Sequence, residues 1–201
     1  MKIIGLTGPS GAGKGFCCGF FAKYEIPCID TDDLYHKLLI PPSECVNELV
    51  ENFGKSILNE SNGINRKKLA DIVFSDENNG KLELLNKITH KYVLAKTMEV
   101  IEKCKAENAT AAVVDAPLLF EAGFDRFCDF CIAVISKEEL RVKRIMERDS
   151  INQEAALMRV HSQKSDNFYI SRADYTVTND TDTASLEEQL KNIFIKENLI
   201  V

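Results

Sequence analysis

Two glycines and a lysine near the start of the chain have the spacing of a phosphate-binding loop. The segment from Gly8 to Gly15 reads GPSGAGKG, so that four residues separate Gly8 from Gly13 and Lys14 follows directly. Glycines in such a loop let backbone N–H groups curl around a phosphate, and the lysine ammonium reaches the outer phosphates of a nucleoside triphosphate. The pattern therefore predicts a triphosphate-binding loop.

One position departs from the usual form of this motif. A Ser or Thr normally follows the lysine, and its hydroxyl holds Mg²⁺, but this chain has Gly15 followed by Phe16. Mg²⁺ keeps several water ligands and needs only one or two protein ligands, so phosphates, water and nearby carboxylates could coordinate it. Two interpretations stay open, an enzyme with an altered metal site and a protein that binds a nucleotide without turning it over.

The elements around the loop favour phosphate binding over a purely structural turn. A strand is expected at Lys2–Thr7, directly before the loop, and a helix-compatible stretch at 16–24 follows it. The motif requires this strand, loop and helix context. The residues expected to contact the nucleoside triphosphate here are Gly11, Ala12, Gly13, Lys14, Gly15 and Phe16.

Short apolar runs recur along the chain between helical stretches, which is typical of an α/β fold. Such runs predict a five-stranded parallel sheet with helices on both faces, in a three-layer arrangement. Ligands of such sheets bind beyond the carboxyl ends of the strands, so residues that follow the strands should converge on one cleft. The expected strands are Lys2–Thr7, Pro27–Asp30, Ala111–Asp115, Phe130–Ile135 and Tyr175–Thr178.

Two segments between the strands are expected to carry substrate and lid functions. A mostly helical insertion at about 33–108 could hold a second substrate. Its stretch at 79–107 has helical periodicity and would be a helix on the order of 40 Å long, for which a kink or break is expected. The region at about 141–170 is rich in arginine and lysine. We expect 1–201 to form one domain that includes both segments.

The arginines of the second segment allow two interpretations. Arg141, Arg144 and Arg148 recur at helical i, i+3 and i+7 spacing and should share one face. One interpretation is a solvated helix paired with its own glutamates, which is common for charged stretches. The other is a lid whose arginines clamp a phosphoryl group, and beside a phosphate-binding loop we favour the lid.

Composition excludes some classes of partner. The chain has 201 residues, 45% hydrophobic and 28% charged, with a formal net charge of -6. This balance provides no basic surface for nucleic acid or an anionic membrane. No apolar run approaches the length of a membrane span, and the chain opens on a strand rather than a secretion signal. We therefore expect a cytoplasmic protein.

The seven cysteines are odd in number and irregularly placed. Free thiols in a reducing compartment are the simpler expectation. Cys128 and Cys131 have metal-type spacing, yet no second pair completes a site. Cys17 and Cys18 are expected to be packing residues. The sequence thus favours no metal or redox role for these thiols.

An ordered series of motifs along nearly the whole chain resembles the dephospho-CoA kinase family. The series departs from the family at Gly15 and Phe16, where Ser or Thr is usual, and at Lys91, where a proline usually follows the histidine. Each motif alone is weak, but the order is specific. The matching segments are Gly5–Gly8, Ile29–Asp32, Leu85–His90, Asp115–Glu121 and Arg144–Asp149, with Gln163 and Asn179.

The resemblance implies an ATP-dependent kinase that phosphorylates the ribose 3′-hydroxyl of dephospho-CoA, giving CoA and ADP in the last step of coenzyme A biosynthesis. It implies Mg²⁺ as cofactor, ATP and dephospho-CoA as the bound partners, and a monomer or weak homo-oligomer. Two alternatives stay open. The first is another P-loop kinase acting on a nucleotide or small alcohol, and the second is a non-catalytic nucleotide-binding protein.

The resemblance also suggests roles for individual residues. Lys14 would reach the γ-phosphate, and Arg144 and Arg148 would stabilise charge on the transferring group. Asp32 would accept the hydroxyl proton or orient the hydroxyl, although an aspartate there could instead cap the helix expected near Leu34.

The remaining expected contacts concern the acceptor, the metal and the adenine. Asp115 would hold Mg²⁺ through water, and Asn179 would contact the adenine of ATP. Residues expected to bind the acceptor, besides Asp32, are Arg66, His90, Pro117 and Leu118.

Overall fold

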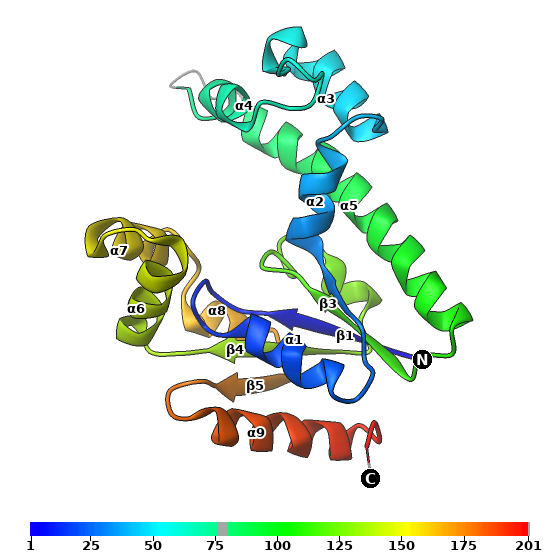
Figure 1. The fold of residues 1–201 in the computed structure, drawn as a ribbon, viewed down its shortest axis with the longest axis vertical. Coiled ribbons are helices and arrows are strands. Elements are labelled where there is room, and N and C mark those ends of the chain that lie inside the picture. The colour runs from blue at the N-terminus through cyan, green and yellow to red at the C-terminus, as the bar shows by residue number, and fades with distance from the viewer. Residues whose placement is uncertain (76–79, 201) are drawn as a thin grey trace. The chain divides into compact units, whose positions relative to one another are not determined.

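The computed structural model describes residues 1–75 and 80–200 (Figure 1). These residues divide into two compact units. The first unit consists of Met1–Ile29 and Ile101–Val201, and the second consists of Asp30–Val100.

Five strands of the described chain form one parallel sheet in the order β2-β3-β1-β4-β5. The α/β prediction is therefore confirmed, and four strands have the predicted bounds. β2 begins one residue late because Pro27 has no N–H to donate, although its carbonyl accepts from Val113 N at 2.8 Å. The strands are β1 (Lys2–Thr7), β2 (Cys28–Asp30), β3 (Ala111–Asp115), β4 (Phe130–Ile135) and β5 (Tyr175–Thr178).

The central strand β1 is flanked by β3 and β4, and the register of these pairs determines what surrounds its carboxyl end. Leu6 lies opposite Asp115 on β3, and Thr7 lies opposite Ala133 on β4. β1 is buried along its second half because both neighbours and the covering helices exclude solvent. The loop that follows β1 therefore starts from the middle of the sheet.

Helices α1 (Lys14–Ala22) and α9 (Thr183–Lys196) pack together against the sheet. Phe20 and Phe21 of α1 contact Phe194 of α9, and the rings of Phe21 and Phe194 stack with centroids 5.2 Å apart. Burial of these aromatic side chains provides much of the driving force for packing. Leu186, Leu190 and Ile193 form the apolar face of α9 and are buried. α1 begins at Lys14, two residues before the predicted start.

After β4, the chain forms helices α6 (Glu138–Asp149), α7 (Gln153–His161) and α8 (Asp166–Ile170). α6 and α7 pack side by side through a small apolar cluster that includes Val142, Ile145, Ala156 and Val160 (Figure 1). Ser150 adopts a left-handed conformation, with φ at 53°, where α6 ends. The short helix α8 contacts β4, and the 3-10 helix η2 (Phe124–Phe127) contacts β1.

The second unit is helical and has its own apolar core, formed by residues such as Leu49, Ile57, Leu69 and Ile88. The predicted long helix runs as one continuous element of 26 residues, so the expected break does not occur. Residue 79, where that prediction began, lies outside the described residues. The elements are α2 (Thr31–Leu38), α3 (Glu44–Phe53), η1 (Lys55–Ile57), α4 (Arg66–Val73) and most of α5 (Lys81–Ala106).

The expectation that all cysteines are free thiols is wrong for one pair. Cys18 on α1 and Cys28 on β2 form a disulfide, with Cα atoms 5.7 Å apart. The pair escapes sequence reasoning because an odd, irregular set of cysteines does not show which two the fold brings together. Among the thiols, Cys17 is buried as predicted for a packing residue, and burial raises its pKa to about 12.

No helix in the described part of the chain combines the length and the apolar character that a membrane span requires.

Candidate active site

The glycine-rich loop, which we call the P-loop (Gly8–Lys14), joins β1 to α1 and needs its glycines for steric reasons. Gly8 has φ at 137°, and a Cβ there would lie 2.1 Å from the Val134 carbonyl oxygen. Gly13 has φ at 111°, and a Cβ there would lie 2.1 Å from Nδ2 of Asn179. L side chains rarely adopt these conformations, and the neighbouring atoms leave no room for them. The loop is thus pressed tightly against β4 and the residues after β5.

Lys14 is the first residue of α1, and its side chain turns back over the P-loop. Its Nζ donates to the Gly8 carbonyl oxygen at 3.1 Å. The residue before the helix is Gly13, which has no side chain to cap the N–H groups of the first turn. Uncapped N–H groups at a helix N-terminus, together with the helix dipole and an adjacent ammonium, form a binding site for an anion.

Three consecutive carbonyls of the P-loop accept hydrogen bonds from side chains of other elements. Ser10 O accepts from Arg141 Nε at 3.1 Å. Gly11 O accepts from Arg144 Nη1 at 3.1 Å, and Ala12 O accepts from Asn179 Nδ2 at 2.8 Å. These bonds occupy carbonyls of the loop, whereas Ser10 N donates to Gln163 Oε1 and Ala12 N donates to the Pro9 carbonyl. A phosphate would therefore be bound by the other N–H groups of the loop.

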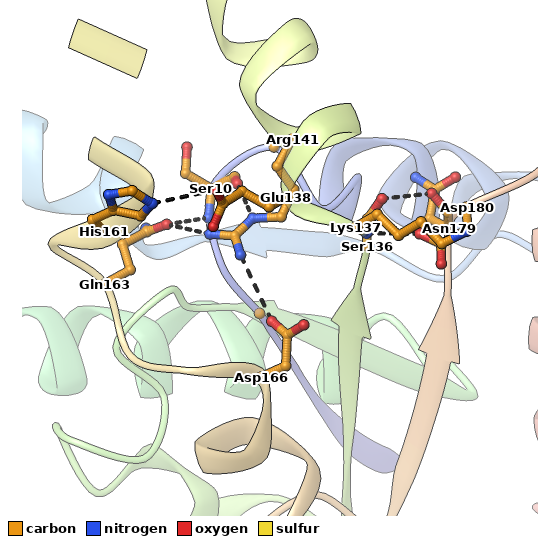
Figure 2. A network of polar contacts seen from close by, with 12 residues as sticks. Ser10, Ser136, Lys137, Glu138, Arg141, His161, Gln163, Asp166, Asn179 and Asp180 are labelled. Atoms are coloured by element: carbon orange, nitrogen blue, oxygen red, sulfur yellow. Dashed lines mark hydrogen bonds and ion pairs between the residues drawn. The ribbon is translucent and has the colours of Figure 1, made fainter. Parts of the chain in front are cut away.

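The guanidinium of Arg144 donates hydrogen bonds to backbone and hydroxyl oxygens. Besides Gly11 O, it donates to the Asn179 carbonyl at 2.9 Å and to Ser136 Oγ at 3.0 Å. Ser136 Oγ in turn donates to Asn179 O at 2.7 Å, a bond visible in Figure 2. Arg144 thereby joins the P-loop to the ends of β4 and β5, and its charge lies beside the loop.

Arg148 is exposed and lies one turn beyond Arg144 on α6. Its Nη2 donates to Ser10 Oγ at 3.3 Å, and the guanidinium also binds both carboxylate oxygens of Asp149, at 2.8 and 2.9 Å. The hydrogen bond to Asp149 raises the pKa of Arg148. The predicted shared face of the three arginines is confirmed, since all three contact the P-loop.

Residues after β3 lie beside the P-loop as well. Asp115 is half-buried, and its Oδ2 lies 3.8 Å from Cys18 Sγ on α1. The Pro117 carbonyl accepts from the buried Thr7 hydroxyl at 3.4 Å. Leu118 is 48% exposed. A carboxylate at the end of a strand next to the P-loop helix is a suitable oxygen donor for a hard cation.

Among the described residues, no group of three or more His, Cys, Asp or Glu side chains forms a metal-binding cluster. A divalent ion at this site would therefore depend on few protein ligands. One carboxylate suits Mg²⁺, which keeps its waters and binds the phosphates of its nucleotide. The residues present fit Mg²⁺ held by Asp115 and a nucleotide.

Asp32, Arg66 and His90 belong to the second unit. The cap of α2 is Asp30, whose Oδ1 accepts from Asp32 N at 2.9 Å and from Asp33 N at 3.1 Å. The alternative interpretation of Asp32 as the helix cap is therefore wrong. Asp32 lies in the first turn of α2 and is exposed.

Arg66 and His90 have different surroundings in this unit. Arg66 begins α4 and lines a cavity of about 330 Å³ together with His36, Leu39 and Pro41, among others. Its charge lies close enough to Tyr35 to oppose the rise that burial causes in the pKa of that phenol. His90 is half-buried on α5, and burial lowers its pKa, which keeps its imidazole neutral at pH 7.

Two residues contact the backbone of the P-loop in a way that the sequence does not indicate. Arg141 was assigned only to the basic face of a lid, and Gln163 only to the series of matching motifs. Gln163 Oε1 accepts from Ser10 N and from Arg141 Nη2, both at 3.0 Å. Spacing alone could not indicate these contacts, since 153 residues separate Gln163 from Ser10.

A phosphate-binding loop between the central strand and a helix, with arginines on its outer side, is the arrangement of P-loop kinases. The chain has this fold and is placed in that class. The family model described as dephospho-CoA kinase matches residues 2–185, so the chain belongs to the dephospho-CoA kinase family.

Individual relatives agree with this assignment over almost the whole chain. A dephospho-CoA kinase from Fusobacterium nucleatum is 38% identical, with 96% of this chain and 95% of the relative covered. One from Lactobacillus johnsonii is 34% identical, with 95% and 96% covered. The solved structure of a dephospho-CoA kinase from Campylobacter jejuni has a TM-score of 0.70 and 27% identity, with 98% of both chains covered.

Proposed function

We propose that this protein transfers the γ-phosphoryl group of ATP to the ribose 3′-hydroxyl of dephospho-CoA, giving CoA and ADP. The observation that carries the proposal is the P-loop of a dephospho-CoA kinase family member, held with its carbonyls bonded to Arg141, Arg144 and Asn179. Such a loop presents N–H groups to phosphate oxygens, and phosphoryl transfer depends chiefly on this positioning and on charge stabilisation.

In the proposed reaction, the 3′-oxygen forms a bond to the γ-phosphorus while the bond from that phosphorus to the β,γ-bridging oxygen breaks. ADP takes the electron pair of the broken bond. Lys14 stabilises the charge on the outer phosphates, and the guanidinium groups of Arg144 and Arg148 add positive charge beside the loop. Asp32 accepts the proton of the 3′-hydroxyl or orients that hydroxyl.

Acceptor contacts are proposed for Arg66, His90, Pro117 and Leu118, in addition to Asp32. Arg66 is an exposed cation at a cavity and suits the anionic diphosphate of dephospho-CoA. Asn179 is proposed to act in ATP binding, and its amide contacts the Ala12 carbonyl of the P-loop. The segment at about 141–170 is proposed to act as a lid.

We propose Mg²⁺ as the cofactor, with Asp115 as the protein group that would hold it through water. When bound, Mg²⁺ neutralises charge on the β- and γ-phosphates. The protein is further proposed to be cytoplasmic, a single functional domain, a monomer or weak homo-oligomer, and free of nucleic acid and membrane partners. The net charge of -6 supports the last point.

Replacing Gly15 by serine is expected to restore the hydroxyl that the motif usually provides. A Cβ at Gly15 would meet nothing within 4 Å, so the variant should fold normally. We expect the Mg²⁺ concentration at half-maximal rate to fall by several-fold, since a hydroxyl ligand adds to phosphate, water and Asp115. Titration of the rate with Mg²⁺ at saturating ATP checks this. An unchanged Mg²⁺ dependence would show that the missing hydroxyl costs nothing here.

The decisive experiment for the function is a coupled assay of ADP formation with dephospho-CoA, ATP and Mg²⁺. We expect turnover that depends on dephospho-CoA, together with CoA as a product. A panel of nucleotides and small alcohols as acceptors separates this function from that of another P-loop kinase. ADP formation no faster than in the absence of acceptor would instead favour a non-catalytic nucleotide-binding protein.

A further inference from the structure

We propose that Gln163, acting with Arg141, is a positioning residue that holds the P-loop in its phosphate-binding shape. The inference rests on the proposed function, because it assumes that the loop binds the phosphates of ATP. Neither side chain needs to contact the nucleotide. Their effect is transmitted through the backbone of Ser10, the residue in the middle of the loop's first turn.

Gln163 and Arg141 together satisfy both polar backbone groups of Ser10. Gln163 Oε1 accepts from Ser10 N at 3.0 Å, and Arg141 Nε donates to Ser10 O at 3.1 Å. Gln163 Oε1 also accepts from Arg141 Nη2 at 3.0 Å, which closes the network. Figure 2 shows the three residues converging, with Gln163 arriving from the segment after α7 and Arg141 from α6.

Arg141 is placed to support the loop rather than to bind a ligand. The residue is only 5% exposed, and this burial lowers its pKa. A buried guanidinium requires partners for its charge and donors. It finds them in Ser10 O, in Gln163 and in Asp166, whose Oδ1 lies 3.7 Å from Nη1. These contacts hold the guanidinium on the carbonyl side of the loop.

The backbone of the P-loop lies so close to α6 that the loop has little room to change its conformation. A Cβ on Gly11 would lie 2.7 Å from the Arg141 carbonyl oxygen, so the loop backbone runs directly against the helix backbone. Gln163 contributes the one acceptor in this network that receives a loop N–H. Without it, Ser10 N would be free to turn, and nucleotide binding would have to restore the order of the loop. Binding is weaker when it must also order the site.

The test compares Gln163→Ala with Gln163→Glu and with the control Gln153→Ala, an exposed glutamine on α7. Affinity for ATP with Mg²⁺ is measured by calorimetric titration, and thermal unfolding is followed without nucleotide. We expect Gln163→Ala to weaken ATP binding about tenfold, as for loss of a charge-assisted hydrogen-bond network. Gln163→Glu should bind within about twofold of the wild type, because its carboxylate accepts the same bonds and is neutralised by Arg141. Gln153→Ala should bind ATP as the wild type does.

Two results would overturn the inference. One is wild-type ATP affinity in Gln163→Ala. The other is a loss of affinity that Gln163→Glu does not restore, which would indicate packing rather than hydrogen bonding. Steady-state kinetics provide a further test. We expect the KM for ATP to rise in Gln163→Ala while the KM for dephospho-CoA stays unchanged.

The titration needs no acceptor, so it separates this inference from the proposed function. A wild-type protein that binds ATP without phosphorylating dephospho-CoA would overturn the proposed function. The affinities of the Gln163 variants would still decide whether this side chain positions the loop.

Discussion

Replacing Lys14 by alanine is expected to lower kcat by about 10²–10³-fold, as for the loss of one strong electrostatic contact to the transition state. The ammonium of Lys14 lies against the Gly8 carbonyl, 3.1 Å away, at the start of the P-loop. No other residue of the loop sequence GPSGAGKG carries a charge, so the substitution removes the loop's own cation. The coupled assay at saturating ATP and dephospho-CoA measures the effect.

The fold should survive this change. Lys14 is half-buried at a helix start, and its loss removes one bond from the loop, a net contribution of about 1 kcal/mol. The thermal midpoint should therefore shift by only a few degrees. Lys191→Ala provides the matched control, since Lys191 is an exposed lysine on α9. If Lys14→Ala retained most of the wild-type kcat, Lys14 would not be a catalytic residue.

The second large effect is expected for Asp32→Asn, which should lower kcat by about 10²–10⁴-fold, the range for loss of a general base. The change keeps the size of the side chain and removes only its charge. The bond from Asp32 N to Asp30 Oδ1 involves the backbone, so the cap of α2 is retained. We expect the KM for ATP to change little, because this side chain is proposed to act on the acceptor hydroxyl.

The adjacent residue supplies a close control for this variant. Asp33 is also exposed, and its N–H donates to the same Asp30 oxygen at 3.1 Å. Its carboxylate forms an exposed i, i+4 ion pair with Lys37, and such pairs contribute little to stability. Asp33→Asn should therefore keep near-normal turnover and the same thermal midpoint. Near-normal turnover of Asp32→Asn itself would remove Asp32 from the catalytic residues.

Local patterns predicted the elements of this protein well because each pattern has a local cause. β1, β3, β4 and β5 have the predicted bounds, since apolar β-branched runs are buried in a parallel sheet. The proline at position 27 moved the start of β2 by one residue, because it cannot donate a ladder bond.

Partners from distant parts of the chain could not be predicted in this way. Spacing placed Arg141, Arg144 and Arg148 on one face of a helix, but it did not show that their hydrogen bonds go to P-loop oxygens. The disulfide between Cys18 and Cys28 was missed too, although only ten residues separate them. The bond forms because the fold brings Cys18 in the middle of α1 next to Cys28 at the start of β2.

The P-loop between a strand and a helix, the parallel α/β sheet and the series of motifs of the dephospho-CoA kinase family are evident from the amino-acid sequence alone. These features are encoded in adjacent residues, whose steric limits and periodicity act over a few positions. The side chains that hold the loop, in contrast, become evident only in the folded chain. Gln163, Arg141 and Asn179 reach Ser10 and Ala12 because parallel strands bring their carboxyl ends to one edge of the sheet, whatever their separation along the chain.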